Sequence, residues 1–329
     1  MKIKPTPGLG METPAAGDSG QPKGWTTNDA AVIEIANLSR RFGSKLALND
    51  VSLRVPRGKV FGLVGENGAG KTTLIKHLLG TLKAESGSVR LFGLDPVADP
   101  LGVLSRLGYL SENRDLPAWM RVDELLRYTQ AFYPKWDARY AEELRRQFGL
   151  DPQARIKQLS RGELARAGLL VALAYRPELL LLDEPSSGLD PVVRRDILET
   201  IIRTVADEGR TVFFSSHLLE EVERVSDEVA MLHEGKLLWC GPLDTIKAAH
   251  HRLTLRFDTP QARPPVIPGA LSINGAGQEW TVICDGARQE LNAMVAKLGA
   301  RIVEEHTPSL NDIFVAVIPN PTHGGGNSK

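Results

Sequence analysis

The sequence predicts an α/β fold with buried, parallel strands, and three observations lead to this prediction. An apolar run at 60–64 leads into a glycine-rich loop at 65–70, and a helical pattern follows at once. The runs 179–182 and 211–215 are short and continuously apolar, as expected of strands buried on both faces. From about 100 to 175 the apolar positions recur with helical spacing.

The composition limits the classes of protein that fit. The 329 residues are enough for one large domain and one smaller one, and a formal net charge of zero gives no support for nucleic-acid binding. Cys240 and Cys284 are too few for a disulfide framework or a zinc cluster and fit a reducing compartment. No apolar run has the length of a membrane span, and the N-terminus lacks the apolar stretch of a signal peptide. Any work at a membrane would therefore go through a partner.

The remaining elements of the first 250 residues follow in order. The expected elements are strands at 32–35, 51–55 and 87–93, helices at 123–133 and 138–148, and a hairpin of 229–232 with 236–239.

The pattern changes after about His250. Four prolines at 260–268 indicate a linker or long loop, and the glycines around 275–277 indicate a strand pair. A helix at 288–298, a strand at 301–305 and a short helix from Ser309 complete the pattern. We therefore expect a main domain at 31–248 with a helical part at about 100–175, a small α+β domain at 249–318, and flexible tails at 1–30 and 319–329.

The loop at 65–72 carries the strongest chemical signal. Its residues fit G-x-x-x-x-G-K-[ST]: Gly65, Glu66, Asn67, Gly68, Ala69, Gly70, Lys71 and Thr72. Glycines let backbone N–H groups converge on a polyanion, and the helix start adds further donors. Lys71 adds a positive charge for the β- and γ-phosphates, and the Thr72 hydroxyl suits Mg²⁺. The alternative, a chance glycine-rich turn, arises in roughly one chain in a hundred and lacks the strand and helix context.

Two further strand ends carry groups that suit phosphate chemistry. Asp183 and Glu184 follow the apolar run 179–182, where ligands of open α/β sheets bind. Asp183 suits Mg²⁺ coordination, directly or through water, and Glu184 suits polarisation of an attacking water. His217 follows another buried run, and its imidazole could donate to phosphate oxygens. Alone, each would be an ordinary strand end, but Lys71 in the same chain favours the functional interpretation.

The segment 159–166 predicts a helix start. Ser160 and Glu163 have the spacing of a capping box. The same geometry, a helix N-terminus with Gly162 beside it, also suits an anion site. Both interpretations stay open on these residues alone.

These features together resemble the nucleotide-binding subunit of an ATP-binding cassette (ABC) transporter. The family's order is an aromatic residue, phosphate loop, glutamine loop, signature, second acidic strand, S/A-G-L-D loop and switch histidine. Seven matching features lie between 32 and 247: Phe42, Gly65–Thr73, Tyr109–Glu112, Leu159–Glu163, Leu181–Glu184, Ser187–Asp190 and His217.

The resemblance implies a P-loop NTPase cassette with a RecA-like mixed sheet core and an inserted helical subdomain. Phe42 would stack on adenine, while Lys71 and the loop amides as far as Thr73 would hold the phosphates of ATP. Thr72 and Asp183 would bind Mg²⁺, and Glu184 would be the catalytic base beside His217. Ser160 and Gly162 would reach the γ-phosphate bound by a second ATPase subunit, and the loop ending at Asp190 would border the nucleotide.

Two departures from the family pattern affect the site. Glu112 stands where the family has glutamine. Its carboxylate can coordinate Mg²⁺ but cannot donate a hydrogen bond. The signature has Arg161 and Glu163 where the family has glycine and glutamine, while Gly162 is retained. We expect an active site with a low rate.

The resemblance also implies partners. The residues 132–137 and 308–314 resemble the exporter-type branch, whose subunits pair with a separate transmembrane permease at the cytoplasmic face of the membrane. The permease would dock near 116–120, where Trp119 and Met120 are either an exposed contact surface or core residues. The alternative function is a soluble or regulatory ABC ATPase acting in membrane-complex gating, translation or DNA repair.

Overall fold

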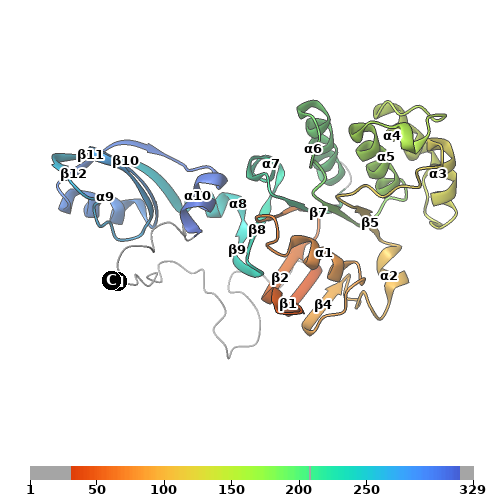
Figure 1. Cartoon of the computed structure of the whole chain (residues 1–329), viewed down its shortest axis with the longest axis horizontal. Coiled ribbons are helices and arrows are strands. Elements are labelled where there is room, and N and C mark those ends of the chain that lie inside the picture. Colours follow the sequence, from red (N-terminus) through yellow and green to blue (C-terminus); the bar gives the residue numbers. More distant parts are fainter. Residues whose placement is uncertain (1–30, 207–208, 319–329) are drawn as a thin grey trace. The chain divides into compact units, whose positions relative to one another are not determined.

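The computed structural model describes residues 31–206 and 209–318, which form two compact units at 31–241 and 242–318 (Figure 1). The larger unit is a cassette of two sheets and the helices packed on them. The smaller unit is an antiparallel sheet with its own helices and its own apolar core.

The main sheet of the cassette positions the predicted site. Its strands lie in the order β5-β6-β7-β3-β8-β9, and the β5–β6, β6–β7, β7–β3 and β3–β8 pairs are parallel. Every residue of β3, β6 and β7 is buried, which confirms the prediction made from their continuous apolar runs. The strands are β3 Val60–Val64, β5 Leu107–Leu110, β6 Leu179–Asp183, β7 Thr211–Ser216, β8 Glu228–His233 and β9 Lys236–Pro242.

A second, antiparallel sheet shares the apolar core of the main sheet. It has the order β2-β1-β4, with β1 Ala31–Phe42, β2 Lys45–Pro56 and β4 Ser86–Leu91. Residues of both sheets belong to one buried cluster, in which Leu48 and Val51 of β2 join Phe61 of β3 and Leu74 of the following helix. The strand and the helix that flank the phosphate loop therefore both belong to a core shared by the two sheets.

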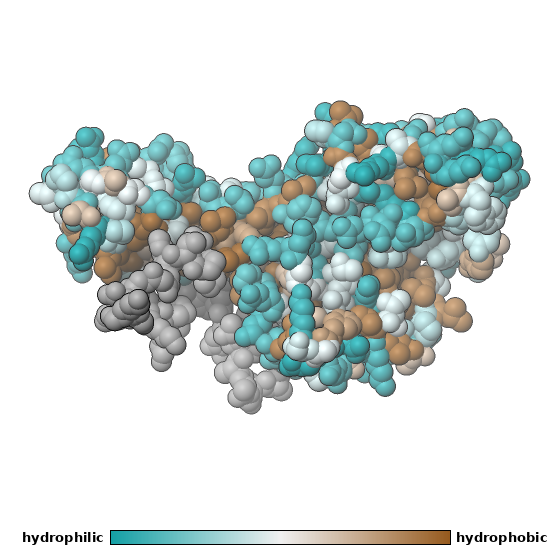
Figure 2. Space-filling model, in the orientation of Figure 1, coloured by the Kyte–Doolittle hydropathy of each residue, from teal (hydrophilic) through white to brown (hydrophobic). Residues whose placement is uncertain are grey.

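The helices of the cassette are α1 Lys71–Leu78, α2 Pro100–Leu104, α3 Val122–Gln130, α4 Ala138–Gln147, η1 Ile156–Gln158, α5 Arg161–Leu173, α6 Pro191–Ala206 and α7 Leu219–Val225. The exposed side of α4 is strongly hydrophilic and carries ion pairs between arginine and glutamate (Figure 2). Helix α5 instead has buried residues all around it, as a helix in the interior should.

The stretch 100–175, predicted as helical, contains strand β5 in addition. With four residues, β5 is too short to show an alternating pattern of its own. Gly108 lets it lie close to α5, because a Cβ there would stand 2.3 Å from the carbonyl oxygen of Ala172.

The first half of the unit 242–318 agrees with the prediction. Strand β10 pairs with the second half of β11, and the chain folds back within β11 at the glycines. A Cβ on Gly275 would stand 2.4 Å from the carbonyl oxygen of Glu279, and the Asp285 N–H donates to the carbonyl oxygen of Gly269, which confirms the strand pair predicted there. The proline-rich segment connects β10 to β11, in agreement with the long-loop alternative of the prediction. The helix predicted at 288–298 and the capped helix after Ser309 are confirmed. The elements are α8 Leu243–Ala248, β10 His250–Gln261, β11 Ala270–Asp285, α9 Arg288–Lys297, β12 Ala300–His306 and α10 Leu310–Val317.

Candidate nucleotide-binding and catalytic site

The phosphate loop joins β3 to α1, as predicted. Gly68 and Gly70 have φ angles of 84° and 113°, in the left-handed region that favours glycine. A Cβ on Gly65 would stand 2.3 Å from the carbonyl oxygen of Leu232, so this position is also closed to larger residues. Gly70 precedes α1 and no side chain caps that helix. The first-turn N–H groups are therefore not engaged by a protein side chain there.

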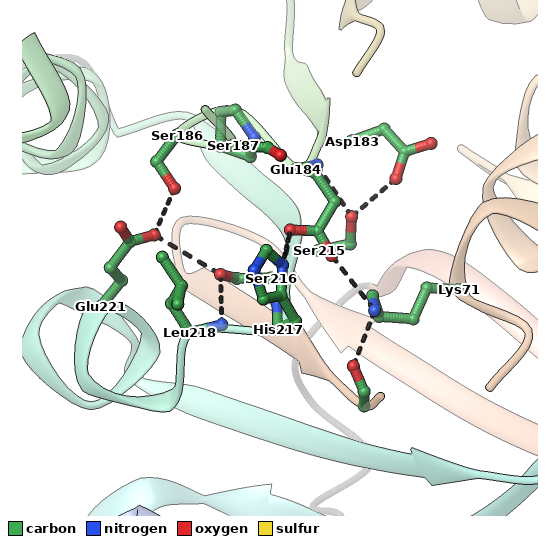
Figure 3. A network of polar contacts seen from close by, with 12 residues as sticks. Lys71, Asp183, Glu184, Ser186, Ser187, Ser215, Ser216, His217, Leu218 and Glu221 are labelled. Carbon is green, nitrogen blue, oxygen red and sulfur yellow. Dashed lines mark hydrogen bonds and ion pairs between the residues drawn. The ribbon is translucent and has the colours of Figure 1, made fainter. Parts of the chain in front are cut away.

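Lys71 is buried beneath this loop. Its Nζ donates to the carbonyl oxygen of Gly65 at 2.6 Å and to that of Glu66 at 3.3 Å. The same atom lies 3.1 Å from Oε1 of Glu184 (Figure 3). The structure thus brings together the lysine of the loop and the second acid of β6, which are more than a hundred positions apart in the sequence.

Glu184 is held on both carboxylate oxygens. Oε1 pairs with Lys71, while Oε2 lies 2.7 Å from Nδ1 of His217 and accepts from the His217 main-chain N–H at 3.3 Å. The backbone of Glu184 has a φ of 48°, which is uncommon for a residue other than glycine. Strain of this kind persists where surrounding contacts hold it, and it concentrates at functional sites.

Asp183 lies one residue earlier, at the end of β6. Its Oδ1 accepts from the hydroxyl of Ser215 at 2.7 Å, and the Thr72 hydroxyl is a second hydrogen-bond partner. Burial raises the pKa of Asp183, and these hydrogen bonds work against that shift. Asp183 is in register with Ser215 on the parallel strand β7, which confirms that His217 ends a strand parallel to the one carrying Asp183.

The segment after Glu184 is held by a residue that the sequence did not indicate. Arg114 is buried, and its guanidinium donates to the carbonyl oxygens of Pro185 at 3.3 Å and Ser187 at 2.7 Å. No local pattern marks Arg114, because its partners lie about seventy positions away. It joins the loop after β5 to the S-G-L-D loop.

The capping box predicted at the start of α5 is confirmed. The Ser160 hydroxyl donates to Oε2 of Glu163 at 2.7 Å, and the Glu163 N–H donates back to that hydroxyl at 3.2 Å. The hydroxyl and the main-chain N–H of Ser160 both donate to Oε2 of Glu163, and these two hydrogen bonds lower the pKa of Glu163. Gly162 packs against Val193 of α6, and Asp190 caps that helix by accepting from the N–H groups of Val192 and Val193.

Two further predicted residues lie at the ends of strands. Phe42, at the end of β1, is 45% exposed, and the Arg40 guanidinium lies 4.9 Å from its ring centroid. Glu112 is exposed and follows β5. Burial raises the pKa of Tyr109 to about 12, and the negative charges of Asp183, Asp115 and Glu112 add to this shift. The charges of Glu112 and Asp183 therefore both raise the pKa of Tyr109.

Trp119 and Met120, the two candidates for a partner surface, differ in their exposure to solvent. Trp119 is 67% exposed, whereas Met120 is 4% exposed and belongs to the core. Neither of the two alternatives holds for both residues, because the chain turns at 117–120 and directs only Trp119 outward. Trp119 alone remains a candidate for contact with a partner.

A glycine loop over a buried lysine, beside two acids and a histidine from neighbouring parallel strands, defines a P-loop nucleotide hydrolase. Comparison with known proteins identifies the particular family. Residues 48–187 match the family described as ABC transporter. The chain belongs to this family.

Relatives support the assignment over most of the chain. The ABC transporter ATP-binding protein YtrB of Bacillus subtilis is 29% identical over 87% of this chain and 97% of its own length. The bacitracin transport ATP-binding protein BcrA of Bacillus licheniformis is 32% identical over 68% of this chain and 74% of its own. A solved ATP-binding subunit of an ABC transporter is 30% identical, with a TM-score of 0.62 over 66% of this chain and 92% of that one.

The family fixes the general activity. The chain is an ATP-binding and ATP-hydrolysing subunit of an ABC transporter, and the relatives support this role over that of a soluble or regulatory ATPase. Within 31–206 and 209–318, no helix is both long and apolar enough to cross a membrane.

Proposed function

We propose that this chain powers export through a separate permease, and that Glu184 is the catalytic base for ATP hydrolysis. The observation that supports this role is the pair of contacts on the Glu184 carboxylate, with Lys71 on one oxygen and His217 on the other. A carboxylate fixed in this way is oriented before substrate arrives, which is what a general base requires.

The phosphate loop would bind the triphosphate. The amides from Gly65 to Thr73 and the Lys71 ammonium suit the β- and γ-phosphates, and the exposed ring of Phe42 suits stacking on adenine. His217 already uses Nδ1 for Glu184, so it would donate to a phosphate oxygen through Nε2.

The residues around Asp183 fit a magnesium ion. A buried carboxylate hydrogen-bonded to the Thr72 hydroxyl provides hard oxygen donors, with Glu112 as a third candidate. In the described part of the chain no three His, Cys, Asp or Glu side chains gather into a metal site. Mg²⁺ commonly keeps several waters and binds substrate phosphates through one or two carboxylates. When bound, Mg²⁺ would neutralise charge on the phosphates.

The signature would act across a dimer. Ser160 is exposed at the start of α5, and the family pattern places Ser160 and Gly162 against the nucleotide of a second subunit, in a homodimer or a heterodimer. The Ser160 hydroxyl proton is engaged by Glu163. Contact with a phosphate would therefore have to redirect that hydroxyl, which agrees with the low rate expected from this signature.

The permease would hold the subunit at the cytoplasmic face of the membrane. Trp119 offers an exposed aromatic contact for it, and the neutral net charge does not favour nucleic acid as a partner. The similarity to a bacitracin transport protein supports export of a small compound. Purification of the chain together with one membrane protein from detergent-solubilised membranes would test this pairing.

The catalytic assignment is tested with Glu184→Gln. The variant should bind ATP, lose hydrolysis and accumulate as a dimer on size-exclusion chromatography, because the amide keeps the shape but cannot accept the proton. Lys71→Ala should instead lose ATP binding, since the two residues act on different steps. Glu220→Gln, an exposed carboxylate on α7, is the matched control and should hydrolyse ATP normally. Wild-type turnover by Glu184→Gln would refute the assignment.

A further inference from the structure

Helix α7 carries a buried carboxylate with no role in the site described so far. Glu221 is 6% exposed. Burial of an ionised carboxylate is costly unless hydrogen bonds or opposite charge compensate it. Burial raises the pKa of Glu221, while the Ser186 hydroxyl and Arg194 act in the opposite direction. Buried acids that are held by hydrogen bonds and ion pairs are common at functional sites.

The partners of Glu221 come from three different segments. Oε2 accepts from the hydroxyl of Ser186 and, at 3.4 Å, from the hydroxyl of Ser216 (Figure 3). Oε1 lies 3.1 Å from Nε of Arg194 on α6. One carboxylate thus contacts the chain after β6, the end of β7 and the start of α6.

The first two contacts lie next to the residues proposed to carry out hydrolysis. Ser186 is two positions after Glu184, and Ser216 directly precedes His217. The Ser216 hydroxyl also accepts from the N–H of Leu218 at 3.0 Å, which fixes the turn on the other side of the histidine. Glu221 therefore spans the two chain segments that bring Glu184 and His217 within 2.7 Å of each other.

The third contact, with Arg194, links Glu221 to the S-G-L-D loop as well. Arg194 pairs with Glu221 and also donates to the carbonyl oxygen of Leu189 at 3.4 Å. Residues on both sides of Ser187 are thereby tied to the same carboxylate, directly or through one guanidinium.

The position of α7 itself is closely fixed. Gly62 of β3 lies against it, and a Cβ at Gly62 would stand 2.4 Å from Cγ1 of Val222, the neighbour of Glu221. A helix seated this closely on the central strand cannot shift without moving the sheet. Glu221 is therefore a rigid anchor rather than a mobile side chain.

We infer that Glu221 is a positioning residue for ATP hydrolysis, whose carboxylate holds the segment after Glu184 in register with the segment that carries His217. The inference rests on the proposed roles of Glu184 and His217. It assigns Glu221 no contact with ATP. A group displaced by about 1 Å in this way can lower turnover by roughly 100-fold.

The test is a steady-state comparison of Glu221→Ala, Glu221→Gln and the control Glu220→Ala, with binding of a fluorescent ATP analogue measured separately. We expect kcat of Glu221→Ala to fall at least tenfold while nucleotide affinity stays within about twofold, since no contact to the phosphate loop is lost. Glu221→Gln keeps the shape and an acceptor oxygen, so it should recover part of kcat. Glu220→Ala should match the wild type.

Two controls separate the possible explanations. Thermal unfolding shows whether Glu221→Ala is folded, and Glu221→Gln serves if it is not. Ser186→Ala should lower kcat as well, and its effect should not add to that of Glu221→Ala, because both remove the same contact. Normal kcat in folded Glu221→Ala and Glu221→Gln, with Glu184→Gln inactive, would overturn this inference alone. Activity of Glu184→Gln would instead overturn the proposed catalytic base.

Discussion

Gly162 of the signature allows packing and function to be separated by experiment. A Cβ at this position would stand 2.8 Å from Cγ2 and 3.3 Å from Cγ1 of Val193. Real Cβ atoms essentially never approach within 3.0 Å, so Gly162→Ala requires movement. Val193 is β-branched and lies in a helix, where its χ1 is nearly fixed, so the movement must come from α5 or α6.

The expected magnitude follows from two opposing effects. Overpacking of this kind costs about 1–3 kcal/mol, and alanine regains at most about 1 kcal/mol in helix propensity. Gly162 is in the first turn of α5 and has no positive φ, so alanine adds no backbone strain there. Gly162→Ala should therefore lower the free energy of unfolding by up to about 2 kcal/mol.

Val193→Ala supplies the compensating change. Alone, it removes two buried methyl groups and should cost roughly 1.6 kcal/mol at about 0.8 kcal/mol each. In the double variant the new methyl at 162 occupies part of the space vacated at 193. The double variant should therefore be more stable than the sum of the single effects predicts, by about 1–2 kcal/mol.

Urea unfolding without nucleotide measures the three variants, and ATP hydrolysis is measured in parallel. We expect the double variant to regain stability but not turnover, because Gly162 is also proposed to approach a phosphate across the dimer. Strictly additive free energies would refute the packing argument. Full turnover by the double variant would show that the glycine serves packing only.

Two further predictions concern buried and paired carboxylates. Burial raises the pKa of Asp183 in the folded protein, so its ionised form destabilises the fold at neutral pH. Asp183→Asn should raise Tm of the nucleotide-free protein by about 2–4 °C at pH 7 while abolishing hydrolysis, and a lower Tm would contradict this. The Arg106 guanidinium lowers the pKa of Glu178 to about 2, so this pair stabilises the fold above the ordinary value of 4.5 and is lost as the pH falls towards 2. Glu178→Gln should therefore lower the free energy of unfolding at neutral pH by less than about 1 kcal/mol, since the pair is partly exposed. Thermal unfolding at several pH values should show the difference in Tm from the wild type shrinking below about pH 4.

Local signals in the sequence predicted several structural features of the candidate site. The phosphate loop needs glycines at fixed offsets, and the left-handed φ angles of Gly68 and Gly70 agree with that requirement. The buried strands β6 and β7 were visible as apolar runs, so the neighbourhood of Asp183 and His217 could be predicted. The capping box of Ser160 and Glu163 depends only on residues three positions apart.

Features that depend on distant partners could not be predicted in the same way. The left-handed backbone of Glu184 and the contacts of Arg114 and Glu221 follow from how strands and loops meet in space. Met120 is buried, and no single-sequence pattern distinguishes a buried methionine beside an exposed tryptophan from a contact surface.

The order of strands in the main sheet has a consequence for synthesis of the chain. Strand β3, which leads into the phosphate loop, pairs on one side with β7 and on the other with β8. Its first partner begins at Thr211, so β3 emerges from the ribosome long before either neighbour exists. During that interval its apolar residues and unpaired edges are open to association with other chains. The nascent protein should therefore depend on chaperone protection until about two thirds of its length has been made, and it should acquire ATPase activity only after His217 has emerged.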